Sequence, residues 1–120
     1  QVLIKKELKK IAYGKKNIIF TQNIEKAIYN SNCIITDTWF SMGSKKTAIS
    51  AKYFKKYQVN EKNIKGANPK VAFMHCLPAK RGQEVTKEVI DNKKISIVWD
   101  EAENRLHIQK AILEWCLKKI

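Results

Sequence analysis

The sequence feature that most constrains the fold is an apolar run, residues 71–75, followed closely by a proline. Such a run is typical of a strand that is buried on both faces inside a parallel sheet. Pro78 cannot continue a central strand, because it has no backbone N–H to donate. His75 and Cys76 are therefore expected where the strand ends and a loop begins. In open α/β sheets, this carboxyl edge is where ligands bind.

Strand-like and helix-like segments alternate along the rest of the chain. We expect strands at residues 17–21, 33–37, 71–75 and 95–99. We expect helices at residues 2–13, 24–29, 44–57, 60–66, 86–91 and 100–119, with Asn23 and Thr86 as the caps of the second and fifth. This alternation predicts an α/β fold with a parallel sheet.

Length and composition indicate one small domain with a modest core. The hydrophobic content of 44% excludes a disordered chain, and the longest apolar runs reach only about half of the roughly 20 residues that a membrane span needs. No secretory signal opens the sequence, so we expect a cytoplasmic protein without a membrane partner. Cys33, Cys76 and Cys116 form no Cys-x-x-Cys pair, which predicts free thiols and no metal site. Cys33 and Cys116 are expected in the core.

The formal net charge of +13 is the feature that favours a nucleic-acid partner. Of the 24 cationic side chains, however, only Arg81 and Arg105 are arginines. No aromatic residues alternate with the basic clusters to form a stacking platform. We therefore expect lysine-rich solvated faces and no nucleic-acid binding. A basic nucleic-acid-binding module and a non-catalytic interaction module stay open as alternatives.

Polar side chains follow three of the expected strands. Asp37 follows the second, His75 and Cys76 end the third, and Asp100 and Glu101 follow the fourth, with Arg105 early in the next helix. Because the carboxyl ends of parallel strands share one edge of the sheet, these groups can converge on one ligand. The alternative is that they only cap loops, since strand ends are polar in any α/β protein. His75 and Cys76 point to opposite faces of a strand, so we do not expect a Cys–His dyad.

Three blocks of the sequence, residues 37–43, 73–86 and 100–111, resemble the ornithine carbamoyltransferase family. Their order and spacing match. The resemblance implies a three-layer α/β/α, Rossmann-like parallel sheet with strand order 2-1-3-4-5, of which the first strand is absent here. Residues 1–120 would then form most of the ornithine-binding domain, with the helix at 102–119 packed on an amino-terminal domain. That other domain would carry a Ser-x-Arg-Thr-Arg motif for carbamoyl phosphate, which this chain lacks.

The implied reaction is attack of the δ-amino group of L-ornithine on carbamoyl phosphate, which gives citrulline and phosphate. The resemblance implies a homotrimer and no cofactor, because the acyl phosphate is already activated. The 120-residue chain alone is not expected to turn over substrate. A carbamoyltransferase for another amine, such as putrescine or an acylated ornithine, stays open as the alternative within this class.

The resemblance assigns the ornithine side of the site to three residues. Asp37 would pair with the ammonium group of the substrate, for which a carboxylate is the charge-matched acceptor. Ser41 and the backbone of Met42 would contact the amino-acid end of ornithine. The alternatives are loop capping for Asp37 and simple packing for Met42.

The resemblance assigns the carbamoyl side to three others. Cys76 would lie beside the δ-amino group and the carbamoyl carbon, where a thiol can orient the amine or relay its proton; the alternative is a buried, inert cysteine. Leu77 would offer backbone contacts to the carbamoyl group and form a cis peptide with Pro78. Arg105 would reach the carbamoyl oxygen or the phosphate; its alternative is a surface ion pair with Glu101.

Two expectations about the sheet and the last helix follow from the same resemblance. The strands at 33–37, 71–75 and 96–99 should lie side by side, and the strand at 18–21 should be separated from them by a gap or pair aberrantly. The apolar stripe of the last helix, which includes Leu106, Leu113 and Leu117, should be partly exposed.

Overall fold

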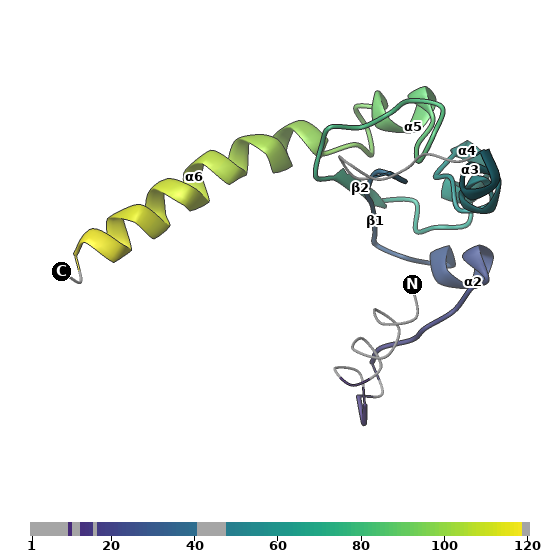
Figure 1. Ribbon diagram of the computed structural model, residues 1–120, viewed down its shortest axis with the longest axis horizontal. Coiled ribbons are helices and arrows are strands. Elements are labelled where there is room, and N and C mark those ends of the chain that lie inside the picture. The colour runs from purple at the N-terminus through teal and green to yellow at the C-terminus, as the bar shows by residue number, and fades with distance from the viewer. Residues whose placement is uncertain (1–9, 11–12, 16, 41–47, 119–120) are drawn as a thin grey trace.

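The fold alternates helices with two parallel strands, as the sequence predicts (Figure 1). The computed structural model describes residues 10, 13–15, 17–40 and 48–118. Its elements in chain order are α2 (Ile24–Ile28), β1 (Cys33–Thr36), α3 (Ala48–Lys55), α4 (Glu61–Ile64), β2 (Ala72–His75), α5 (Lys87–Ile90) and α6 (Val98–Leu117). No helix within these described ranges is long and apolar enough to cross a membrane.

The two strands pair in a register that sets the position of everything after them. β1 and β2 are parallel, with Cys33 opposite Ala72 and Thr36 opposite His75. Both strands end at this last pair. The next residue of each strand, Asp37 or Cys76, therefore leaves the sheet at the same level and the same edge.

The prediction of a strand at 95–99 is wrong. In the structure this segment forms only a single bridge to β2. Ser96 bridges Phe73, whose N–H donates to the Ile95 carbonyl at 2.7 Å and whose carbonyl accepts from the Ile97 N–H at 3.0 Å. Helix α6 begins at Val98, and a helical backbone turns its donors along its own axis and away from β2. The predicted neighbours are nevertheless observed, since β2 lies between β1 and this segment.

The expected strand at 17–21 is also wrong. None of these residues is in a strand, and none of the described segments pairs with them. Ile19 and Phe20 are 73% and 52% exposed, so this apolar stretch gains neither a ladder partner nor burial. A strand is stabilised by backbone hydrogen bonds to a neighbouring strand and by burial of its apolar side chains. Residues 17–21 gain neither, so they do not form a strand. The helix expected at 2–13 lies largely outside the described residues.

The core surrounds β2 and the segments that follow it. Phe73, Val85 and Val98 are fully buried, and Ile34 and Val59 join the same cluster. The loop after β2 is tied to the chain before α4, because the Val59 N–H donates to the Glu84 carbonyl at 2.8 Å.

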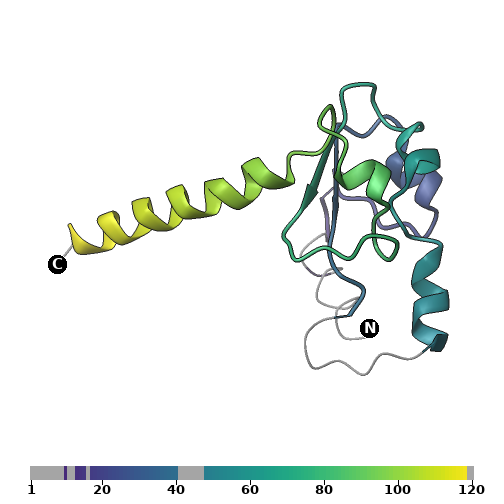
Figure 2. The same ribbon diagram turned by 90° about the horizontal axis from the view of Figure 1, so that it is seen from above.

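Helix α6 projects away from this core, as Figures 1 and 2 show. Val98 in its first turn is buried, whereas every described residue from Ala102 onward is exposed. Leu106, Leu113 and Leu117 are among these, so the predicted exposure of the apolar stripe is confirmed.

We expect Phe73→Ala to lower the free energy of unfolding by about 3–5 kcal/mol, because it deletes the central side chain of the core. Urea denaturation followed by circular dichroism measures this. The control, Tyr29→Ala, removes an aromatic ring that is 80% exposed, and it should change stability by less than about 0.5 kcal/mol. Equal losses in the two variants would contradict the placement of the core.

Candidate functional site

The structure brings Asp37 and Cys76 into contact at the carboxyl edge of the sheet. The Cys76 thiol donates a hydrogen bond to Asp37 Oδ1 with a sulfur–oxygen distance of 3.3 Å. The residues are 39 positions apart in the chain, and the β1–β2 register alone makes them neighbours. Both are exposed, so a ligand can reach them. Cys76 is therefore not the buried cysteine of the alternative.

Asp37 is held in its ionised form. The Thr38 N–H donates to Oδ1 at 2.6 Å, and the Cys76 thiol donates to the same oxygen. These bonds, first that of Thr38 and then that of Cys76, hold the pKa of the Asp37 carboxyl below its ordinary value. An exposed, anionic oxygen pair at a sheet edge can accept a cationic group from a ligand.

Cys76 is held in its neutral form. Its partial removal from water, then the hydrogen bond and the charge of Asp37, and lastly the charge of Glu101 raise the pKa of the thiol. At neutral pH the sulfur therefore carries a proton, and it acts as a donor to Asp37. A thiol in this state can orient a neighbouring group or pass a proton, whereas an activated nucleophile would need a lowered pKa.

His75 lies beneath this edge and is fully buried. Its Nδ1 accepts from the Leu77 N–H at 2.9 Å, and its Nε2 lies 3.4 Å from Glu84 Oε1. Since Nδ1 is an acceptor, the proton of a neutral ring sits on Nε2 and faces Glu84. The His75 ring therefore accepts a hydrogen bond from Leu77 and approaches Glu84 without bonding to it, as expected for a residue outside a Cys–His dyad.

Leu77 carries an unusual backbone. Its peptide bond to Pro78 is cis, so this prediction is confirmed, and its φ is 50°. A positive φ is uncommon for a residue with a Cβ atom. The bond from the Leu77 N–H to His75 helps to hold the turn that presents Cys76.

The remaining predicted site residues are not brought to Asp37 and Cys76 by any described contact. Arg105 is exposed on α6, and the ion pair with Glu101 offered as its alternative is not formed in the described structure. Ser41 and Met42 lie outside the described residues. The described ranges contain no group of three or more His, Cys, Asp or Glu side chains that could hold a metal ion.

The sequence reasoning missed Glu84 as a functional candidate, and it named Glu101 without foreseeing its partner. Glu84 is fully buried, and its carboxylate accepts from the Lys80 N–H and approaches His75. Glu101 accepts from the backbone N–H of His75 at 3.0 Å. Both acids stand within the sequence blocks that carry the family resemblance, but only the tertiary structure shows their partners.

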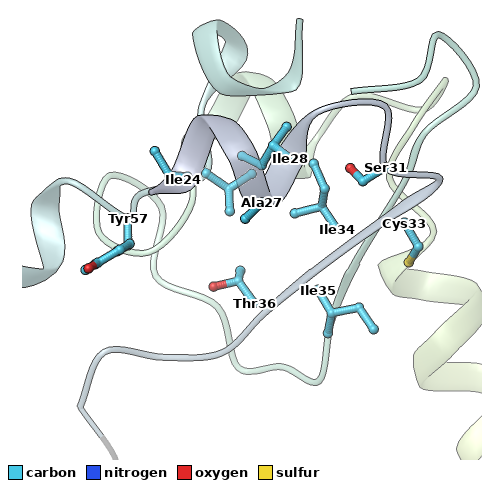
Figure 3. A pocket seen from close by; sticks show the side chains of 10 residues that line it. Ile24, Ala27, Ile28, Ser31, Cys33, Ile34, Ile35, Thr36 and Tyr57 are labelled. Carbon is cyan, nitrogen blue, oxygen red and sulfur yellow. The ribbon is translucent and has the colours of Figure 1, made fainter. Parts of the chain in front are cut away.

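A separate hollow of about 310 Å³ lies between α2 and β1 (Figure 3). None of its lining residues is charged, and neither Asp37 nor Cys76 is among them. They are Ile24, Ala27, Ile28, Ser31, Cys33, Ile34, Ile35, Thr36, Tyr57 and Val59. This hollow offers no counter-charge for an ammonium or phosphate group. Cys33, like Cys116, is exposed, so the expectation that both lie in the core is wrong.

We expect Asp37→Asn to lower the pKa of the Cys76 thiol, because the carboxylate charge disfavours the thiolate. Alkylation of Cys76 by iodoacetamide below pH 8 should then be faster, and its midpoint should move to lower pH. The measurement uses a background in which Cys33 and Cys116 are serine, so that one thiol reacts. Asp91→Asn is the matched control, since Asp91 pairs with Arg81. An unchanged profile for Asp37→Asn would contradict the observed contact.

Comparison with known proteins adds an independent finding. Residues 1–116 match the family model described as "Aspartate/ornithine carbamoyltransferase, Asp/Orn binding domain". The ornithine carbamoyltransferase of Brucella abortus (strain 2308) is 56% identical over 101 residues, which cover 84% of this chain and 32% of that protein. The enzyme of Mesorhizobium japonicum is 53% identical over 106 residues, which cover 88% and 34%.

Solved structures agree with the sequence relatives. The ornithine carbamoyltransferase structure from Thermus thermophilus superposes with a TM-score of 0.73 at 36% identity, covering 89% of this chain and 33% of that one. The chain therefore spans about a third of the length of the proteins it matches. From the family match and these identities, the chain belongs to the aspartate/ornithine carbamoyltransferase family and carries its Asp/Orn-binding domain.

Proposed function

We propose that the edge formed by Asp37 and Cys76 binds L-ornithine and directs its δ-amino group onto carbamoyl phosphate. The observation that carries this proposal is the 3.3 Å contact between an ionised carboxylate and a neutral thiol at the carboxyl ends of two parallel strands. The named relatives support the choice of ornithine as the amine.

The reaction forms one bond and breaks another. The δ-nitrogen attacks the carbamoyl carbon, a C–N bond forms, the C–O bond to phosphate breaks, and the amine loses a proton. The enzyme therefore has to hold two charged substrates in line and accept that proton. No cofactor is needed in this scheme, because the acyl phosphate supplies the leaving group.

The described residues suit the two tasks differently. Asp37, anionic and exposed, is the acceptor for the ammonium group of the amine. Cys76 donates a hydrogen bond to Asp37 Oδ1 and can orient the δ-amino group and relay its proton without a covalent intermediate. Leu77 would present its backbone to the carbamoyl group. Arg105 would meet the carbamoyl oxygen or phosphate with its planar guanidinium, which suits oxyanions.

Several parts of the proposal concern the whole enzyme. Ser41 and Met42 would contact the amino-acid end of ornithine, and carbamoyl phosphate would also need arginines that this sequence does not contain in a Ser-x-Arg-Thr-Arg motif. The working protein would be a cytoplasmic homotrimer. Its complete sheet would be the five-stranded, three-layer arrangement, with α6 packed on the amino-terminal domain.

The test is a chimera in which this sequence replaces the matching segment of the Brucella abortus enzyme, which is 56% identical over 101 residues. We expect citrulline formation with ornithine, and much less product with putrescine or N-acetylornithine. Asp37→Ala should lower kcat/KM by about 100-fold or more, because the substrate loses its counter-charge. Cys76→Ser should lower kcat by about 10–100-fold with a smaller change in KM.

The matched control for these variants is Asp91→Ala, which removes an exposed carboxylate that pairs with Arg81. It should leave citrulline formation unchanged. Full activity in Asp37→Ala would contradict the assignment of the site. A chimera that carbamoylates putrescine faster than ornithine would contradict the choice of ornithine as the substrate.

A further inference from the structure

Glu101 makes a contact that links the last helix to the end of β2. Its Oε2 accepts a hydrogen bond from the backbone N–H of His75 at 3.0 Å. Glu101 stands in the first turn of α6, and His75 is the last residue of β2, directly before Cys76. A side-chain carboxylate thus occupies the place that a neighbouring strand would fill.

The strand geometry explains why this backbone group needs such a partner. Phe73 uses both its N–H and its carbonyl on the segment at 95–97. Backbone groups in a strand alternate in direction, so the N–H of His75, two residues further, points to the same side. The strand-like pairing stops there because α6 begins at Val98. Without Glu101, the backbone N–H of the fully buried His75 would lack this acceptor, and an unpaired buried donor destabilises a fold.

The same contact lies at the base of a long helix. α6 has 20 residues and is about 30 Å long at 1.5 Å per residue. Its described contact with the core is at the start, at Val98 and Glu101, since the described residues from Ala102 onward are exposed (Figure 2). Arg105 lies on the same helix face as Glu101, four residues and about 6 Å further along. A tilt of about 10° at Glu101 would move the Arg105 backbone by about 1 Å and the far end of the helix by about 4 Å.

From these observations we infer that Glu101 is a positioning residue: by binding the His75 N–H it fixes the start of α6 against β2 and so sets where Arg105 stands relative to Cys76. The inference rests on the proposed function for the role of Arg105, but its structural half stands without it. A carboxylate is suited to this task because a hydrogen bond to a charged acceptor is about twice as strong as a neutral one.

The first test measures, on the 120-residue chain, whether the hydrogen bond from the His75 N–H to Glu101 fixes the start of α6. The two exposed native cysteines, Cys33 at the start of β1 and Cys116 near the end of α6, carry spin labels in a Cys76→Ser background. Pulsed electron resonance then gives the distance distribution between sheet and helix. We expect Glu101→Ala to broaden or shift it, Glu101→Gln, which keeps an acceptor oxygen, to preserve most of it, and Glu103→Ala to leave it unchanged. An unchanged distribution in Glu101→Ala would overturn the inference.

Hydrogen exchange of the His75 amide gives a second readout, which can be measured in the unaltered chain as well as in a variant. We expect this amide to be protected in the unaltered chain and to exchange at least 10-fold faster in Glu101→Ala. Rapid exchange in the unaltered chain would overturn the inference even if Glu101→Ala failed to fold. The exposed Glu103, which lies 3.9 Å from Nε2 of the exposed His107, supplies the control for a general effect of charge removal on α6.

The second test uses the chimera and separates positioning from simple stability. We expect Glu101→Ala to lower kcat/KM for carbamoyl phosphate by about 10–100-fold, since a misplacement of about 1 Å can cost that much. In an Arg105→Ala background the same substitution should have little further effect, because the residue through which it acts is gone. Effects that multiply in the double variant would overturn the role in setting Arg105. If the unaltered chimera makes no citrulline, the proposed function fails. The spin-label and exchange results still decide whether Glu101 fixes the start of α6 against β2.

Discussion

The parallel register of β1 and β2 is the constraint on which the rest of the site depends. Pairing of Thr36 with His75 ends both strands at one level, and the next residues are Asp37 and Cys76. A shift of one residue would turn the alternating side chains of a strand to the other face, and the carboxylate and the thiol would part. The register is maintained because Ile34 and Phe73, which are paired across the two strands, are buried in one core.

The electrostatics of the edge follow from this contact. One carboxylate oxygen of Asp37 receives two donors, so Asp37 stays ionised while Cys76 keeps its proton. Beneath them, the backbone of His75 and Leu77 is tied to the ring of His75 and to Glu101. A buried polar arrangement of this kind has a high cost if one partner is lost, and it holds a site rigidly when all are present.

Much of the local structure could be predicted, and the errors share one cause. β1, β2, α2, α5 and the bulk of α6 lie where hydrophobic periodicity placed them, because that signal is local. The predicted cap Asn23 accepts from the Lys26 N–H, whereas the Thr86 side chain makes no capping hydrogen bond. The segment at 17–21 has the residue types of a strand but finds no partner among the described segments. The segment at 95–99 does find one in Phe73, but α6 begins at Val98 and shortens the pairing to a single bridge. Neither outcome is visible in composition. The predicted burial of Cys33 and Cys116 is also wrong, because burial depends on what packs against a residue.

The sequence by itself determined that this chain alternates strands and helices, and that Asp37 and Cys76 each follow a strand at a sheet edge. It determined this because apolar runs, prolines and caps act over a few residues. Only the tertiary structure decided that Asp37 and Cys76 touch, that Glu84 approaches the His75 ring, and that Glu101 completes the hydrogen bonding of β2. Those pairings join residues that are far apart in the chain, and their geometry is set by register and packing, which local sequence signals do not contain.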